Sequence, residues 1–510
     1  MRTSVLLALA LLFAACGPSS SHQGTGDCND PNNLKVDPNN CGTCMNKCDS
    51  TQTCSDGVCV AASCNPGETR ACYDGAPSTE GVGPCVGGQQ TCTNEGYWGI
   101  CMGEVTPTGE TCGDSIDNNC NGMVDEDTDS DGDGFTTCGG DCCDSITDGC
   151  SDPKLVNPGA FDAPGNNLDD DCDGMKDNVA ANCDTGIASN TGNAMDFGKA
   201  IDICQTATTG DKKWGLISAS WSLTNGSGTP DAQGHSVRPK FGQNVLPKGG
   251  SALALLSTGV AAGKGDNSPK YAGDGAVSTS HSGGTSPFPN DFLNAPPNNG
   301  TLPNAPGCPE PDGNTAEDPE MLTLKIRTPT NAKSFSMNVN FFSYEYPEYT
   351  CSFYNDFFVV LLDSSYSGQP ANPTDKNLAF YQDANMKKYP VGVNLAYGDT
   401  GLFTQCVNGQ TGCAGLGVSW PEGTISTCKA VTDLSQTGFD YPEGGECDTN
   451  SLAGGGTGWL LTAGNVKGGE VMTLRIAIWD TSDTNLDSSV VIDNFQWSVD
   501  TANPGTIVVN

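Results

Sequence analysis

The amino-acid sequence predicts a mainly β protein: an antiparallel β-sandwich preceded by a disulfide-rich and Asp-rich irregular region. Three observations support this prediction. Short apolar runs separated by turn residues fill the second half of the chain, cysteines recur every few residues near its start, and aspartates accumulate between the two. Spaced strands without intervening helices are typical of a sandwich, whereas the cysteine-rich and Asp-rich stretches lack the apolar periodicity of regular elements.

The first residues have the pattern of an export signal. Residues 5–15 form an apolar run that ends in small residues before Cys16, and this run is too short to span a bilayer as a permanent helix. The segment resembles a bacterial lipoprotein signal, except that Phe13 stands where that family prefers Leu. We therefore expect a signal peptide over 1–15, lipidation of Cys16 and a tether over 16–27. An ordinary secretory peptide with a free Cys16 is the alternative.

Charge limits the partners that this chain can bind. The formal net charge is −38 and the sequence pI is about 4.1, so nucleic acids and anionic membrane surfaces would repel the protein. Divalent cations and neutral polymers remain as candidate partners. The three histidines lie in no Ser/His/Asp-like or HExxH context. The chain therefore lacks the residue patterns that hydrolases and zinc enzymes commonly use, and we do not expect an enzyme.

Cysteine usage indicates an oxidising compartment. Setting Cys16 aside, the 27 cysteines leave 26, an even number that suits complete pairing. Residues 28–109 carry almost no aliphatic periodicity and must be held by disulfides. Cys41, Cys44 and Cys48, followed by Cys54 and Cys59, also fit a zinc knuckle, but the exported context and the absence of nearby histidine favour cystines.

Residues 110–178 form an acidic stretch. Between Glu110 and Asp177 there are 19 acidic residues, of which 17 are Asp, against two lysines. Disordered acidic segments favour Glu and Lys, whereas the short Asp side chain suits loops that bring oxygens onto a hard cation. A segment at 117–125 recurs 52 residues later at 169–177, which indicates a repeated structural unit.

The sharpest motif begins at Asp129. Asp129, Asp131 and Asp133 alternate ahead of Gly134, as in the front half of a calcium loop, and Phe135 stands where such a loop offers its carbonyl. The twelfth position is glycine instead of the bidentate Glu of an EF-hand. Asp141, Asp144 or a carboxylate from the repeats must therefore complete the shell, unless these residues are simply solvated turns.

Together these motifs resemble the MopE-like metal-binding motif of bacterial surface proteins, whose signature is a pair of acidic units flanking such a loop and a Gly-Asp-Cys step at 140–142. The family name evokes copper, but histidine is absent from this region and hard oxygen ligands favour calcium. The candidate metal ligands are Asp117, Asp125, Asp129, Asp131, Asp133, Phe135, Asp141, Asp169, Asp171, Asp173 and Asp177.

The region 186–500 is expected to form the β-sandwich. A helix is predicted over 193–204, with Asn193 as its N-cap. The predicted strands are 214–223, 252–257, 321–327, 335–344, 357–362, 459–462, 471–479 and 490–499. The Gly/Asn/Pro/Ser-rich stretch 259–320 is too long for an ordinary connection and is expected to be a disordered or surface insertion.

Acidic residues also follow the predicted strands. A second ion site is possible at Glu345, Asp356, Asp480, Asp487 and Asp493, beside aromatic residues. Carboxylates at strand ends coordinate a structural ion, act as a glycosidase acid and base, or cap turns. The spacing alone does not decide among these three roles.

The β region resembles the choice-of-anchor L domain over 194–499. The resemblance rests on the Arg238-Pro-Lys-Phe-Gly242 segment, on Glu345-Tyr-Pro-Glu-Tyr349 and on Asn355-Asp356. It implies an exported bacterial surface protein, and it carries no catalytic assignment. Four further cysteines in the variable loop region look like local staples: Cys406, Cys413, Cys428 and Cys447.

The sequence thus favours a noncatalytic protein at the outer membrane or cell surface. A lipid anchor would hold a calcium-stabilised stalk and a β domain that adheres to an extracellular polymer or protein. The alternative is a surface hydrolase acting on polysaccharide or peptide, in which Glu345, Glu348 or Asp356 would be the catalytic acid.

Overall fold

The computed structural model describes residues 41–43, 46, 48, 52–55, 57–61, 64–94, 96–125, 127, 129–178, 182–272, 284–413, 420–442 and 452–509. The expected signal peptide, Cys16 and the tether lie outside the described residues. The chain divides into two compact units between residues 127 and 128. The acidic stretch expected as one region at 110–178 is therefore shared between the units, and its second half belongs with the β-sandwich.

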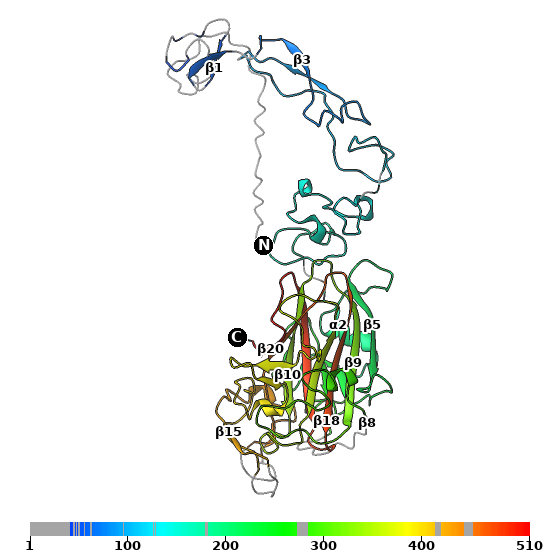
Figure 1. Ribbon diagram of the computed structural model, residues 1–510, viewed down its shortest axis with the longest axis vertical. Helices are drawn as coiled ribbons and strands as arrows, with labels where there is room; N and C mark the ends of the chain where they lie inside the picture. Colours follow the sequence, from blue (N-terminus) through cyan, green and yellow to red (C-terminus); the bar gives the residue numbers. More distant parts are fainter. Residues whose placement is uncertain are drawn as a thin grey trace, which may run out of the picture. The chain divides into compact units, whose positions relative to one another are not determined.

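The first unit contains two small antiparallel hairpins. Strand β1 (Gln52–Ser55) pairs with β2 (Val58–Ala61), and β3 (Thr69–Cys72) pairs with β4 (Gly88–Thr91) (Figure 1). Each hairpin is too short to be stable alone in water. Among the described residues of this unit, every buried hydrophobic residue is a cysteine.

Disulfides therefore take the place of a core in the first unit, as the sequence predicts. The bridges are Cys41–Cys54, Cys48–Cys59, Cys64–Cys92, Cys72–Cys101 and Cys85–Cys120. Cys41, Cys48 and Cys59 place three sulfurs close together, but all three are half of a cystine, so they offer no thiolate for zinc. The cystine interpretation is confirmed over the zinc knuckle.

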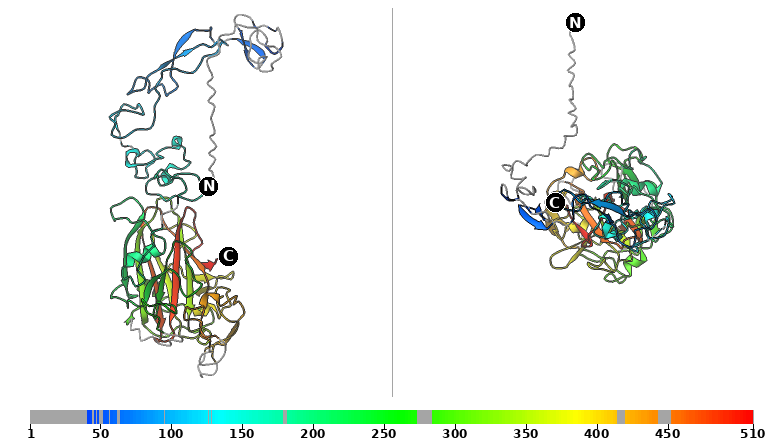
Figure 2. Two further views of the ribbon diagram at one scale, coloured as in Figure 1. Left: turned by 180° about the vertical axis from the view of Figure 1, so that it is seen from behind. Right: turned by 90° about the horizontal axis from the view of Figure 1, so that it is seen from above.

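The second unit is built on two antiparallel sheets (Figures 1 and 2). One sheet has the order β20-β17-β10-β19-β7-β6, with β16 beside β10; the other has the order β11-β18-β9-β5, with β8 beside β9. The bounds are β5 (Gly215–Ser222), β6 (His235–Arg238), β7 (Leu253–Ser257), β8 (Thr285–Ser286), β9 (Ala316–Arg327), β10 (Ser334–Ser343), β11 (Phe357–Asp363), β16 (Gly455–Gly456), β17 (Leu460–Asn465), β18 (Val471–Thr481), β19 (Ser488–Ser498) and β20 (Gly505–Val508).

All eight strands predicted from the sequence are present, and the mainly β antiparallel fold is confirmed. Strands β6, β8, β16 and β20 were not predicted, because each has at most four residues. Two small hairpins, β12 (Phe380–Gln382) with β13 (Lys388–Pro390) and β14 (Gly409–Thr411) with β15 (Gly423–Ile425), lie outside the sheets. Short strands carry too few residues for an alternating pattern to stand out.

The main core lies between the two sheets. Alternate residues of the long strands point into it, such as Leu322, Leu324 and Ile326 of β9, which face Phe335 and Met337 of β10 within one buried cluster. Helix α2 (Ala194–Ala200) packs Phe197 into the same cluster, and the Asn193 side chain caps it by accepting from the Met195 amide, as predicted. The helix ends four residues earlier than expected.

The stretch 259–320, expected to be a disordered or surface insertion, is ordered in its described part after residue 283. Residues 285–293 form β8 and helix α3 (Asn290–Leu293), and 316–320 begin β9. Phe288, Phe292 and Leu302 cover the outer face of the β11–β18–β9 sheet, packing on Phe357 and Trp479. The few large apolar residues of this stretch pack on the sheet and hold it in place. They are too sparse among the Gly, Asn and Pro residues to form a recognisable sequence pattern.

Short 3-10 turns connect the remaining segments: η1 (Thr137–Gly139), η2 (Ile146–Asp148), η3 (Pro153–Leu155), η4 (Val393–Leu395) and η6 (Thr432–Leu434). Disulfides Cys183–Cys204, Cys308–Cys351 and Cys406–Cys428 staple the β region, so Cys406 and Cys428 are the local staple that the sequence predicts. Over the described residues, no helix has both the length and the apolar character needed to cross a bilayer.

Candidate metal centre

Three short loops share one backbone shape: 117–122, 129–134 and 169–174. In each, the carboxylate of the first residue accepts hydrogen bonds from the amides of the fifth and sixth residues. The two distances are 3.0 and 2.9 Å in the first loop, 3.1 and 3.0 Å in the second, and 3.0 and 2.9 Å in the third. The fifth side chain in turn accepts from the seventh amide. The central calcium-like loop and the two repeats are thus three forms of the same turn.

The sixth residue of each loop has to be glycine. Gly122, Gly134 and Gly174 have φ angles of +93°, +96° and +93°, a region that side chains with a Cβ rarely adopt. Gly122 and Gly174 have no neighbouring atom within 4 Å of where a Cβ would stand. The glycine is therefore required by backbone conformation and not by space.

The repeat is longer than the sequence comparison indicated. Glu110 lies 52 residues before Asp162, and each carboxylate accepts from an amide of the loop that follows it: Glu110 Oε1 from the third residue, Asn119, at 2.8 Å, and Asp162 Oδ1 from the second residue, Asp170, at 2.7 Å. Each carboxylate lies against the loop that follows it. The first and third loops therefore both receive an acidic side chain from outside the loop.

Asp125 and Asp177, the ninth residues of their loops, have a structural role in common. Asp125 accepts hydrogen bonds from the Gly113 and Ser115 amides at 2.9 and 3.1 Å. Asp177 accepts in the same way from amides of 165–167, at 2.8 to 3.2 Å. In the described part of the chain, neither carboxylate belongs to a close group of three acidic residues. Both predicted metal ligands thus close the loop through its backbone.

The second loop brings together the largest group of carboxylates. Asp129, Asp131 and Asp144 have ligand atoms within 4.8 Å of one another, and so do Asp131, Asp133 and Asp141. Asp131 belongs to both groups. Asp141 and Asp144, two of the alternatives that the sequence left open, both lie beside the loop carboxylates; whether they complete a cation's shell stays a prediction.

Burial and mutual repulsion act on this group. Burial, followed by neighbouring carboxylates, raises the pKa of Asp131 and of Asp133, and it raises the pKa of Asp141 to about 6. Asp131 Oδ2 and Asp141 Oδ2 are buried without a hydrogen-bond partner. Oxygens that lack both water and a donor are available to a cation.

The third loop forms a second group. Asp162, Asp169 and Asp171 have ligand atoms within 4.8 Å of one another, and burial, then repulsion by Asp162 and Asp173, raises the pKa of Asp171 to about 6. Asp162 was not predicted as a ligand. Its position 52 residues after Glu110 was the available signal, but the two stretches share too few letters before residue 117 for the repeat to be noticed there.

The other predicted ligands lie beside these groups. Asp173 accepts from the Met175 amide at 2.8 Å and from Asn178 Nδ2 at 2.7 Å. Asp117 holds its own loop together and, within the described residues, joins no group of three carboxylates. Phe135 is buried and donates its amide to Asp133 at 2.7 Å; whether its carbonyl is a ligand stays a prediction.

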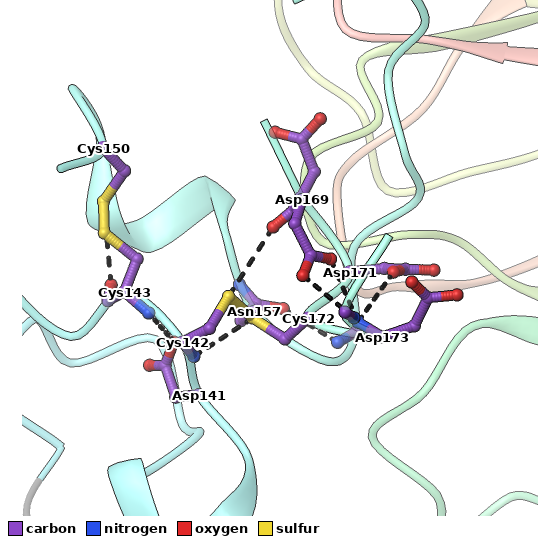
Figure 3. Close-up of a disulfide and its surroundings, with 12 residues drawn as sticks. Asp141, Cys142, Cys143, Cys150, Asn157, Asp169, Asp171, Cys172 and Asp173 are labelled. Atoms are coloured by element: carbon purple, nitrogen blue, oxygen red, sulfur yellow. Dashed lines mark hydrogen bonds between the residues drawn. A yellow bond between two sulfur atoms is a disulfide. The ribbon is translucent and has the colours of Figure 1, made fainter. Parts of the chain in front are cut away.

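A disulfide joins the two carboxylate groups. Cys142–Cys172 links the residue after Asp141 to the centre of the third loop, and Figure 3 shows Asp141 on one side of this bridge with Asp169, Asp171 and Asp173 gathered on the other. The neighbouring bridge Cys143–Cys150 closes a short turn beside it. Two loops that are distant in sequence are thus fixed near each other before any cation binds.

Asn157 connects the second loop to the sandwich. Its buried side chain donates to Asp133 Oδ2 at 2.7 Å and accepts from Thr330 Oγ1 at 2.8 Å. Thr330 lies in the turn between β9 and β10, and its amide also donates to the Gly159 carbonyl at 3.0 Å. One amide side chain therefore touches a carboxylate of the metal-binding group and a turn of the β-sandwich.

The chemistry of these donors fits a hard divalent cation. Both groups consist of carboxylates, without histidine or free thiolate. Oxygen-only sets with several carboxylates suit calcium, whereas copper favours imidazole and sulfur. The unpartnered buried oxygens of Asp131 and Asp141 are the specific places that such an ion would satisfy.

The possible second ion site is only partly assembled. Glu345, Asp356 and Asp480 are all buried and influence one another's ionisation. Asp493 lies elsewhere: its Oδ2 accepts from the Lys248 amide and, at 3.2 Å, from the Gly249 amide. The Asp487 carboxylate lies against Gly259. Glu345, Asp356 and Asp480 thus lie near one another, whereas Asp493 accepts from a turn; whether any of them binds an ion stays a prediction.

Two family models match parts of this chain. Residues 310–496 match the "Choice-of-anchor L domain", a narrower stretch than the resemblance over 194–499. Residues 107–126 and 150–178 match the "Putative metal-binding motif"; the second loop lies between these segments. No curated protein and no solved structure matches the chain. A surface-anchor-like domain together with a metal-binding motif is consistent with a cell-surface protein, and the motif and Asp groups suggest metal binding.

Proposed function

We propose that this chain is a lipid-anchored cell-surface protein whose Asp-rich loops bind calcium and whose β-sandwich binds an extracellular ligand. The observation that carries the calcium part is the pair of carboxylate groups around Asp131 and Asp171, the first of which has buried oxygens without a donor. The match to a metal-binding motif supports the same assignment.

Calcium is the cation that these loops favour. Their alternating oxygens resemble the front half of a calcium loop, and Asp141 and Asp144 supply the carboxylates that would follow. Magnesium demands a small octahedral shell and keeps its water, so a group of several protein carboxylates suits it less well. A bound cation would remove the repulsion among these aspartates and tighten the loops.

Calorimetry of the full mature chain, with its disulfides intact, tests this proposal. Calcium at about 100 times its dissociation constant should stabilise the folded protein by about 2.7 kcal/mol, since it binds the folded form only. Magnesium should give a smaller gain, and EDTA should remove it. No calcium heat at millimolar concentration, together with a protease sensitivity that EDTA leaves unchanged, would reduce the region to a solvated acidic spacer.

The anchor rests on the sequence around Cys16. Lipidation would hold the protein at the outer membrane or cell surface, and the many disulfides suit export. Replacing Cys16→Ser should move the protein from the detergent phase to the aqueous phase in a partitioning experiment. Unchanged partitioning would contradict lipidation.

The role assigned to the β-sandwich is binding without turnover, with an extracellular polymer or protein as ligand. Glu345, Glu348 and Asp356, the acids of the rival hydrolase, are buried in the structure, so a polysaccharide would not reach them without a rearrangement. Glycan and peptide arrays probed with the full chain separate the two functions. Binding without product supports the adhesive role, and hydrolysis that Glu345→Gln abolishes would establish the enzyme.

A further inference from the structure

Four strand ends meet at one place in the β-sandwich. Ser343 at the end of β10 pairs with Ser488 at the start of β19, and Glu345 follows two residues later. In the other sheet Phe357 pairs with Trp479, so Asp356 and Asp480, the next residues outward, lie beside each other. The Ser488 hydroxyl faces Asp356. The register of two sheets thus brings together three carboxyl groups and one hydroxyl.

These carboxyl groups are buried without a positive partner. Glu345, Asp356 and Asp480 have exposed fractions of 2%, 0% and 3%. Among the ion pairs of the described residues, none includes any of the three. Two further carboxylates, Asp318 and Asp483, add negative potential. A buried charge is strongly unfavourable unless a cation or a proton compensates it.

Several oxygens here lack any donor. Both carboxylate oxygens of Asp356, Glu345 Oε2 and Ser488 Oγ are buried and make no hydrogen bond. Ser488 is fully buried, and its hydroxyl lies next to Asp356. A neutral hydroxyl without a partner beside a buried carboxylate is an observation separate from the acidic cluster. It marks a space that a cation bound by oxygen atoms would occupy.

Glu345 accepts from the Asp356 amide and Asp480 from the Thr481 amide, but backbone capping does not explain Asp356. Asp184 shows what a buried capping carboxylate looks like in the same domain: its oxygens accept from the Ser251 amide at 2.6 Å, the Ala252 amide at 2.5 Å and the Ser251 hydroxyl at 2.8 Å. Neither carboxylate oxygen of Asp356 accepts a hydrogen bond of this kind. The two remaining explanations are a bound cation and shared protons.

We propose that Glu345, Asp356, Asp480 and the Ser488 hydroxyl bind one divalent cation of the calcium type between the ends of the two sheets. All four donors are oxygen, and three carry a charge, as hard cations require. Their oxygens are not all within 4.8 Å of one another, unlike those of the Asp loops. Binding therefore draws them together and closes this end of the sandwich.

Calcium counting on the full chain tests this site apart from the loops. A background variant removes the loop carboxylates by Asp117→Asn, Asp131→Asn, Asp133→Asn, Asp169→Asn and Asp171→Asn. Equilibrium dialysis followed by elemental analysis should find one calcium per chain remaining. Adding Asp356→Asn should remove it, whereas Asp493→Asn, the matched buried carboxylate that caps a turn, should leave it in place.

The outcomes separate this site from the proposed function. If the background variant binds no calcium, or Asp356→Asn leaves the count unchanged, the sandwich site is overturned and protons compensate the buried group. If the background variant binds as many ions as the wild type, the proposed binding of calcium by the Asp-rich loops is contradicted.

Hydrogen exchange of the wild-type chain needs no variant. Calcium in place of EDTA should slow exchange at 344–356 and at 480–488 by about tenfold, which corresponds to 1.4 kcal/mol. Unchanged exchange in both segments would also overturn the proposal.

Discussion

The first and third loops are copies with the same backbone and different charge. Both begin with an Asp that accepts from its fifth and sixth amides, both are closed by a ninth Asp, and both receive an outer carboxylate, Glu110 or Asp162. Only the third has a group of three carboxylates, since Asp171 stands where the first has Asn119. The comparison shows that amide hydrogen bonds determine the shape of the loop. The side chain at its third position determines whether three carboxylates lie close together.

Removing the shared carboxylates of the second loop should have the largest effect. Asp131 belongs to both of that loop's carboxylate groups, so the double replacement Asp131→Asn and Asp133→Asn should abolish most of the calcium stabilisation, about 2 to 3 kcal/mol at saturating calcium. Thermal melting with calcium and with EDTA measures the difference. The exposed Asp114→Asn is the control. An unchanged calcium effect in the double variant would place the ion elsewhere.

Asn157→Ala should have the next largest effect. The change removes a donor from Asp133 Oδ2 and leaves the half-buried Thr330 hydroxyl and the buried Gly159 amide without their acceptor. Unsatisfied buried groups cost about 1 to 3 kcal/mol. Melting in EDTA should therefore show a loss that does not depend on calcium. A stability equal to that of the wild type would mean that the loops are not coupled to the sandwich through this residue.

Exchanging one residue between the two copies tests their difference directly. Asn119→Asp should complete a group of three carboxylates with Glu110 and Asp117. The Oε2 atom of Glu110 is already buried and has no hydrogen-bond partner. Asp171→Asn should undo the corresponding group. We expect calcium affinity to rise about tenfold in the first loop and to fall about tenfold in the third, or 1.4 kcal/mol each way.

Titration calorimetry of both single variants and of the combined variant measures this exchange. In the combined variant the affinity of the first loop should be about tenfold higher and that of the third loop about tenfold lower than in the wild type. Equal affinities in all three variants would show that residue three of the loop does not control binding.

The smallest effect tests the shared backbone. Gly122→Ala and Gly174→Ala place a Cβ at φ +93° in open space, so each should cost about 1 kcal/mol of conformational strain, with or without calcium. Gly192→Ala, which has open space and no unusual φ, is the control. Melting should show similar losses for the two variants; a large difference between them would mean that the loops are not equivalent.

Much of the fold could be read from the sequence because the signals are local. The strands β9, β10, β11 and β18 were found from their apolar runs, and the three loops from side chains that bond to amides at most five residues away. Cysteine spacing and the lack of apolar residues likewise predicted a first unit held by cystines. Such features need no knowledge of the partner strand.

The rest depended on contacts between distant residues. The packing of Phe292 on Trp479, for example, joins residues 187 positions apart. The sequence alone determined which residues have the chemistry to bind a cation and which segments form strands. Only the tertiary structure decided that Glu345, Asp356 and Asp480 meet while Asp493 caps a turn, because strand order and register set those distances and the spacing along the chain does not.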